Sequence, residues 1–123
     1  MLIGKSLEDY LKTILILKEG SGVVRSVDVA RYMNFSKASV SHAVKLLREK
    51  GLLIVDNEWN LCLTENGLVY AKRILERHTC FVEILTSLGV DEKTAEQDAC
   101  RMEHILSDQT FEKVRNVYLA QKH

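Results

Sequence analysis

Three residues in the last quarter of the chain carry side chains that could bind a metal ion. Cys100, Glu103 and His104 stand at positions i, i+3 and i+4 of a segment whose pattern is helical. This spacing places a thiolate, a carboxylate and an imidazole on one helix face. All three groups coordinate first-row transition metals. The triplet therefore predicts a mixed-ligand metal site, with a further ligand coming from elsewhere in the fold.

The charged residues are unevenly distributed along a chain whose net charge is zero. Residues 34–55 carry four Lys/Arg against one Glu, whereas residues 91–112 carry seven acidic residues against two basic ones. A basic segment suits a polyanion and an acidic segment suits a cation. Both kinds of segment are also common as solvated surfaces, so charge supports these partners only modestly.

The elements that must position these residues can be read from the apolar periodicity and from the residues at helix ends. Helices are expected over residues 6–18, 27–33, 36–50, 64–88, 91–106 and 107–120. The expected capping residues are Ser6, Ser26, Ser36, Thr64 and Asp91, and Gly51 and Gly89 are expected to end helices. Residues 52–55 and 61–64 are short β-type runs on either side of a polar turn, and they predict a hairpin.

Three helices followed by a hairpin is the element order of a winged helix-turn-helix. The second and third helices are separated by a short turn, as this motif requires. The third helix would then enter the major groove with its first residues against base edges. The candidate DNA-contacting residues are Ser36, Lys37, Ser39, Ser41, His42 and Lys45. The two lysines are expected on phosphates. A solvated helix face, or a winged helix that binds protein, is the alternative.

The expected fold is mainly α, with a winged helix-turn-helix at residues 1–63 and a helical metal-binding and dimerisation domain at residues 64–123. A lone winged helix reads one half-site, so a two-fold homodimer that aligns two half-sites is expected. Apolar residues of the fourth and sixth helices could form either the core or the dimer interface: Leu68, Ala71, Leu75, Val82, Leu85, Phe111, Val114, Val117, Tyr118 and Leu119.

The expected location is the cytoplasm. The longest apolar run, residues 14–17, is far shorter than the roughly 18 residues that span a bilayer. The N-terminus lacks the pattern of a signal peptide. Cys62, Cys80 and Cys100 are odd in number and widely spaced, which argues against a disulfide framework. No membrane partner is expected.

Several motifs of this chain are similar to those of the diphtheria toxin repressor and manganese transport regulator family. They are Ser-Leu-Glu-Asp-Tyr-Leu-Lys-Thr-Ile at 6–14, Ser-Lys-Ala-Ser-Val-Ser at 36–41, Leu63-Thr64-x-x-Gly67, Arg77-His78, and Asp-Ala-Cys-Arg-Met-Glu-His at 98–104. The resemblance covers nearly the whole chain in order. It implies a dimeric repressor of palindromic operators with a divalent metal as co-repressor. It also implies the short two-domain form, without the SH3-like third domain of longer members.

The resemblance also implies a ligand set. Cys100, Glu103 and His104 match family ligands on the fifth helix, Asp9 matches the first-helix ligand and His78 matches a fourth-helix ligand. Two positions depart from manganese-type members, because Lys12 and Cys100 both stand where those members have glutamate. Both departures weaken a manganese assignment, because manganese prefers oxygen-rich sites and thiolate suits softer metals. The expected ion is Fe²⁺ or Mn²⁺, with Co²⁺, Ni²⁺ or Zn²⁺ as alternatives. A second site could use His78 with Glu83 and Glu96.

Two other functions remain open on the sequence. A winged-helix regulator could sense an organic ligand or the oxidation of Cys100, although oxidation requires an exposed thiol of low pKa. An enzyme could use Cys100 as nucleophile and His104 as base, but no third orienting residue or oxyanion site is evident. The chain is therefore expected not to be an enzyme.

Overall fold

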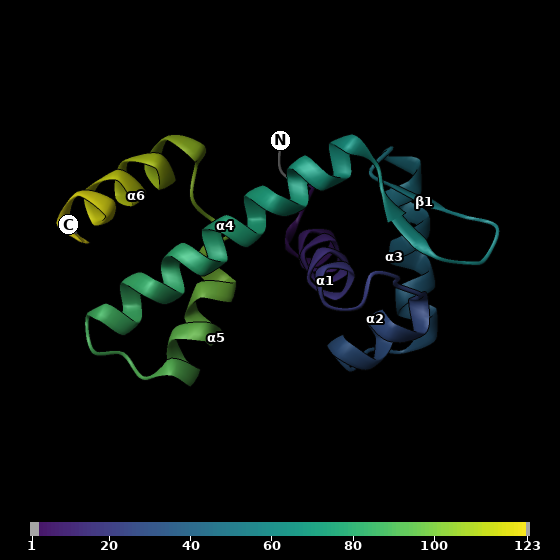
Figure 1. Ribbon diagram of the computed structural model, residues 1–123, viewed down its shortest axis with the longest axis horizontal. Coiled ribbons are helices and arrows are strands. Elements are labelled where there is room, and N and C mark those ends of the chain that lie inside the picture. The colour runs from purple at the N-terminus through teal and green to yellow at the C-terminus, as the bar shows by residue number, and fades with distance from the viewer. Residues whose placement is uncertain (1–2, 123) are drawn as a thin grey trace. The chain divides into compact units, whose positions relative to one another are not determined.

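The computed structural model describes residues 3–122, and this part of the chain holds six α-helices and one two-stranded sheet (Figure 1). The elements are α1 (Lys5–Ser21), α2 (Ser26–Met33), α3 (Lys37–Glu49), β1 (Leu53–Val55), β2 (Leu61–Leu63), α4 (Glu65–Ser87), α5 (Glu92–Met102) and α6 (Asp108–Lys122). This order confirms the predicted fold class, a winged helix-turn-helix followed by a helical region.

The chain forms two compact units that divide between Arg73 and Ile74, inside α4. The first unit contains α1 to α3, the hairpin and the first turns of α4. The second unit contains the rest of α4 with α5 and α6. The predicted domain boundary between residues 63 and 64 stays a prediction, because compactness alone does not define a folding domain.

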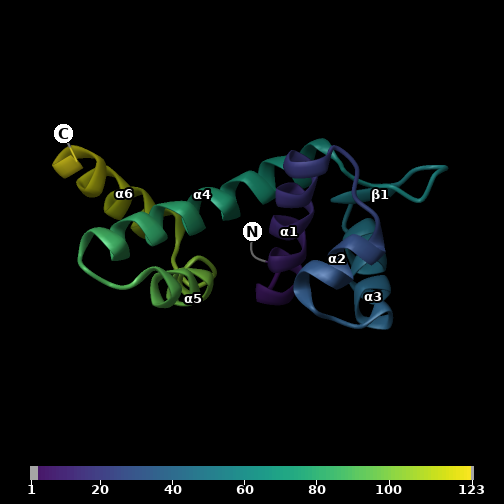
Figure 2. The same cartoon turned by 60° about the horizontal axis from the view of Figure 1, so that its bottom comes forward.

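In the first unit, α1, α2 and α3 pack against one another (Figure 2). Its most deeply buried apolar side chains are Leu11, Ile14, Val24, Val29, Val40, Leu47 and Leu53, each at most 1% exposed. The predicted buried face of α3 is confirmed at Val40, Ala43, Val44 and Leu47. β1 and β2 pair antiparallel, with Ile54 opposite Cys62. The polar face of α3 is consequently left to solvent.

Some of the predicted helix caps are confirmed and others are wrong. The Ser36 hydroxyl accepts the N–H of Ser39 at 3.1 Å and so caps α3, and Asp91 caps α5 in the same way. Ser6 does not cap α1, which begins one residue earlier, after Gly4. Ser26 lies inside α2, because the carboxylate of Asp28 accepts the N–H of Arg25 at 2.9 Å and starts the helix there.

The start of α4 is fixed against the beginning of the wing. The Thr64 hydroxyl accepts the N–H of Gly67 at 3.0 Å and donates to the carbonyl of Gly51 at 2.7 Å. A Cβ atom at Gly67 would lie 2.0 Å from the carbonyl oxygen of Leu52. Glycine is therefore required where α4 approaches Leu52, the residue before β1, which explains why the Leu-Thr-x-x-Gly run closes the wing.

The second unit packs α5 and α6 on either side of the C-terminal half of α4 (Figure 1). Its core joins Phe81 of α4 to Phe111 of α6, whose ring centroids are 5.8 Å apart in an edge-to-face arrangement, together with Cys80 and Ala99. Ala95 and Ala99 are fully buried and let α5 approach closely. Of the apolar stripe predicted for α4, Ala71 is buried and Leu68, Leu75, Val82 and Leu85 are half-buried; Ile74 and Phe81 complete the buried row.

Within residues 3–122, none of the helices has the length and apolar character needed to cross a membrane.

Candidate metal centre and nucleic-acid interface

The six candidate DNA-contacting residues all lie on the exposed side of α3 or at its cap. The hydroxyls of Ser36 and Ser39 are 3.0 Å apart, and Ser36 also caps the helix. Lys37 and Lys45 point their charges to solvent from the same helix, with Arg48 one turn further on. This face offers cations and hydroxyls together, the groups that contact DNA phosphates and base edges.

The polar turn predicted between the two strands of the wing is held by hydrogen bonds to one carboxylate. The Asp56 carboxylate accepts the N–H groups of Glu58 at 2.8 Å and Asn60 at 2.9 Å. These backbone hydrogen bonds, that of Asn60 first, lower the pKa of Asp56. Arg25 Nε lies 3.5 Å from the Asn60 side-chain oxygen, so an exposed cation stands at the base of the wing. Arg25 was not among the predicted DNA-contacting residues, because it lies outside the third helix.

In the second unit, four of the candidate ligands are linked by successive side-chain contacts into one row, here called the polar chain: Glu96, His78, Glu103 and His104. His78 Nε2 lies 2.8 Å from Glu96 Oε2, and His78 Nδ1 lies 2.8 Å from Glu103 Oε2. The other oxygen of the same carboxylate, Glu103 Oε1, lies 3.1 Å from His104 Nε2. Glu103 is thus placed between two imidazoles that come from different parts of the chain.

Cys100, Glu103 and His104 do not share one helix, as was predicted for residues 91–106, whereas His78 lies on the fourth helix as predicted. His78 lies on α4, Glu96 lies on α5, and α5 ends at Met102. The N–H of Glu103 still bonds to the carbonyl of Ala99 at 3.0 Å, but the next N–H, of His104, bonds three residues back to Arg101. The backbone tightens at this point. Glu103 and His104 therefore lie in a turn, while Cys100 stays half-buried on the last helical turn.

Burial separates these residues from ordinary surface acids and bases. The side chain of Glu103 is 0% exposed, that of His104 4% and that of His78 16%. A buried carboxylate is costly unless it is hydrogen-bonded or bound to a cation, and both oxygens of Glu103 have partners. A carboxylate and two imidazoles fit a divalent transition metal.

Asp9 belongs to the first unit and lies half-buried on α1. Its carboxylate pairs with Lys5 Nζ at 3.0 Å and lies 4.0 Å from Lys12 Nζ. Lys12 is itself buried, with 10% of its side chain exposed. The lysine that departs from the manganese-type pattern thus stands beside the predicted first-helix ligand.

The remaining candidates lie outside the polar chain. Glu83 is exposed on α4, and its carboxylate lies 3.9 Å from Lys122 Nζ of α6. Cys80 is buried in the core, and burial is the main cause that raises the pKa of its thiol. Cys62 is half-buried in β2. Cys80 therefore contributes to the packing of the second unit.

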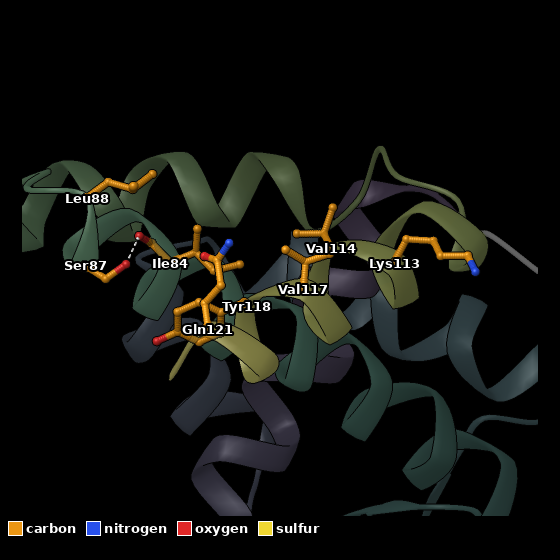
Figure 3. Close-up of a pocket in the computed structure, with 8 residues that line it drawn as sticks. All are labelled: Ile84, Ser87, Leu88, Lys113, Val114, Val117, Tyr118 and Gln121. Carbon is orange, nitrogen blue, oxygen red and sulfur yellow. Dashed lines mark hydrogen bonds between the residues drawn. The ribbon is translucent and has the colours of Figure 1, made fainter. Parts of the chain in front are cut away.

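An apolar groove lies between the end of α4 and α6 (Figure 3). Its lining residues are Ile84, Ser87, Leu88, Lys113, Val114, Val117, Tyr118 and Gln121, and its volume is about 380 Å³. Leu88 is 75% exposed and Val117 57% exposed. Figure 3 shows the Lys113 amine directed away from the apolar side chains. The second unit therefore presents apolar surface that its own core does not cover.

Two family models match nearly the whole chain. Residues 2–59 match the model described as iron dependent repressor, N-terminal DNA binding domain. Residues 64–120 match the model described as iron dependent repressor, metal binding and dimerisation domain.

Individual proteins give the same picture. An uncharacterised HTH-type transcriptional regulator of Methanocaldococcus jannaschii is 35% identical over 115 residues, which are 92% of both chains. The HTH-type transcriptional regulator MntR of Bacillus subtilis is 32% identical over 89% of this chain and 77% of its own.

Among solved structures, the manganese regulator SloR has a TM-score of 0.79 at 28% identity, over 98% of this chain and 55% of that chain. A manganese-dependent transcriptional repressor in complex with manganese has a TM-score of 0.80 at 26% identity, over 93% of this chain and 52% of that one. This chain thus spans about half the length of these two solved structures.

Proposed function

The chain belongs to the iron-dependent repressor family, and we propose that its metal is bound by Asp9, His78, Cys100, Glu103 and His104. It is a metal-dependent, DNA-binding transcriptional repressor with a divalent transition metal as co-repressor. We infer that it acts in the cytoplasm, where its DNA is, and that it controls genes of metal homeostasis.

The observation that carries this ligand set is the buried carboxylate of Glu103 between the imidazoles of His78 and His104. These donors, with the thiolate of Cys100 on the adjoining helical turn, suit Fe²⁺ better than Mn²⁺, because manganese prefers oxygen ligands. A bound divalent ion would supply the positive charge that a buried carboxylate needs. Glu96 is a weaker candidate through its contact with His78, and Glu83 weaker again because it pairs with Lys122.

Asp9 would give the metal its regulatory effect. Asp9 comes from α1 of the first unit, whereas the other proposed ligands come from the second unit. An ion that binds both would favour one arrangement of the DNA-binding unit over others, which is a shift of population toward the competent state. By linkage, metal would then tighten DNA binding and DNA would tighten metal binding by the same factor.

The DNA-reading surface is proposed to be the exposed face of α3 and its cap, with the six residues Ser36, Lys37, Ser39, Ser41, His42 and Lys45. The operator is proposed to be palindromic, because a two-fold dimer presents two such helices to the major groove.

The homodimer is proposed to use the apolar groove between α4 and α6. The region matched to a dimerisation domain, residues 64–120, includes all but one of the groove residues. Leu88→Glu and Val117→Glu place charges on exposed positions, so the monomer should keep its fold while the dimer dissociates. Analytical ultracentrifugation with circular dichroism checks this. Dimers that persist in both variants would move the interface elsewhere.

The ligand set is tested by calorimetric titration of reduced, chelator-treated protein with Mn²⁺, Co²⁺, Zn²⁺ and anaerobic Fe²⁺. The Cys100→Ala/His104→Ala double variant is expected to lose saturable binding. Cys62→Ala is the matched control, because it removes a half-buried thiol that lies in the wing. Binding that the double variant retains would overturn the assigned site.

The alternative of a non-metal signal is not favoured, because the second region matches a metal-binding domain. The enzyme alternative is not favoured either, since the family consists of transcriptional regulators.

A further inference from the structure

Arg77 is a buried arginine whose contacts converge on one turn of the second unit. Its side chain is 5% exposed. Its Nη1 group donates to the carbonyl of Leu106 at 2.6 Å and to the carbonyl of Glu103 at 3.4 Å, and its Nη2 group pairs with the Asp108 carboxylate. The guanidinium also stands over the Phe111 ring, 5.1 Å from the centroid.

These acceptors bracket the turn that follows α5 and precedes α6. Carbonyl groups in a turn that follows a helix have no partner within the helix, so a donor from elsewhere must satisfy them when they are buried. A guanidinium can reach several acceptors at once because its N–H groups form a rigid, planar fork, which an ammonium lacks. Arg77 therefore fixes both ends of residues 103–108.

The same turn carries two of the proposed metal ligands. Arg77 contacts the main-chain oxygen of Glu103, and its neighbour His78 contacts the side-chain oxygen of Glu103 at 2.8 Å. Two consecutive residues of α4 thus hold one ligand from its backbone and from its carboxylate. His104 follows in the same turn.

We propose that Arg77 is a positioning residue for the metal centre: it holds the backbone of the 103–108 turn so that Glu103 and His104 are in place before the metal binds. The proposal rests on the ligand set given above. Groups behind the ligands typically contribute 10- to 100-fold in metal affinity. Without this anchor, part of the binding free energy would be spent on ordering the turn.

The chain offers a close control in Arg115. Its guanidinium stands over the same Phe111 ring at 5.5 Å and pairs with Glu76 at 2.6 Å. These contacts, with a further one to Glu112 at 3.9 Å, do not reach the 103–108 turn. Arg115→Met therefore removes an arginine from the same core without removing the anchor of the ligands.

The test compares Arg77→Lys, Arg77→Met and Arg115→Met with the unmodified protein. Each is measured for the apo melting temperature, for the Kd of Co²⁺ and Mn²⁺ well below that temperature, and for the Co²⁺ absorption spectrum. Both Arg77 variants should bind metal about 10- to 100-fold more weakly, with an altered Co²⁺ spectrum. Arg115→Met should keep the affinity and the spectrum even if its melting temperature falls.

Arg77→Lys keeps the charge and so provides a folded variant if Arg77→Met fails to fold. Metal affinity and spectrum that match those of the unmodified protein in the Arg77→Lys variant would overturn the proposal, whatever the melting temperature. Failure of the unmodified protein to bind metal would overturn the ligand set as well, so the two failures are distinguishable.

Discussion

At the scale of single residues, three of the buried polar side chains among residues 3–122 lie at or beside the proposed metal site. Glu103, His104 and Arg77 are each at most 8% exposed, and within residues 3–122 no buried side-chain nitrogen or oxygen lacks a hydrogen-bond partner. Burying polar groups is tolerated only with such pairing. A buried network of this kind therefore constrains which substitutions the site accepts.

In the first unit, the hydrogen-bonded hydroxyl of Tyr70 leads to a prediction about the pH dependence of stability. Its hydroxyl donates to Glu8 Oε2 at 3.0 Å and accepts the N–H of Ile3 at 3.0 Å. Burial, followed by the hydrogen bond to Glu8, raises the pKa of Tyr70 to about 12. The unfolded chain would lose this proton near pH 10 and the folded chain later. Stability from this group is therefore present below pH 10 and is lost as the pH rises toward 12.

The measurement is thermal unfolding between pH 8 and 12, together with absorbance titration of the tyrosines. The melting temperature of the unmodified protein should fall more steeply above pH 10 than that of Tyr70→Phe. Parallel curves for the two proteins would contradict the proposed link to Tyr70. Tyr32→Phe serves as a control, since Tyr32 is 56% exposed.

Most of the proposed metal ligands were identified from the sequence by residue type and spacing, but their burial could not be predicted. Cys100, Glu103 and His104 were found because their spacing is that of neighbours on a helix. The contact between His78 and Glu103 joins residues 25 positions apart, and only packing brings them together. Arg77 was noted in the sequence only as part of the Arg77-His78 motif. Its burial could not be predicted, because nothing in the local sequence distinguishes a buried arginine from an exposed one.

At the scale of elements, the sequence predicted the order of helices and strands but not every end. α3 was placed well because its cap, its buried face and its terminal glycine all agree. α5 was predicted to run to residue 106 and ends at Met102. Residues 103–106 include no glycine, asparagine or proline, the residues that usually mark the end of a helix. The tightened bonds after Glu103 depend on contacts with α4, which a single sequence does not display.

The junction between β1 and α4 gives the element-scale prediction. Gly67→Ala adds a methyl group 2.0 Å from the Leu52 carbonyl, so the helix or the strand must move. Overpacking of this kind costs about 1–3 kcal/mol or more, which outweighs the roughly 1 kcal/mol gained by alanine over glycine in a helix. Gly67→Ala should therefore lower the free energy of unfolding.

Gly20→Ala is the matched control, because Gly20 is also helical and an added Cβ there meets open space. This variant should be more stable by about 0.5–1 kcal/mol. Urea unfolding of both variants distinguishes the two effects. Equal stability changes at the two glycines would show that helix propensity alone decides, and that the contact with Leu52 is unimportant.

At the scale of the whole molecule, basic and acidic residues are concentrated in different segments, which suits DNA binding and metal binding respectively. The DNA-reading helix has cations on its exposed face, while acidic residues are concentrated between residues 91 and 112, around the proposed metal ligands. A repressor with zero net charge can therefore attract a polyanion to one region and a cation to another. The difference in charge between the two segments was visible in the sequence. The position of the cations on the exposed face of α3 followed from the helical periodicity.

The salt dependence of operator binding tests this division. Each lysine on a phosphate releases counterions, so the logarithm of affinity falls with the logarithm of salt concentration by about 0.9 per contact. A dimer carries each lysine twice. Lys37→Ala or Lys45→Ala should therefore make the slope about 1.8 less steep for the metal-loaded protein. Lys93→Ala, in the acidic segment, should leave the slope unchanged. Fluorescence anisotropy across a series of KCl concentrations measures it, and a slope that both α3 variants retain would mean that these lysines do not contact the DNA backbone.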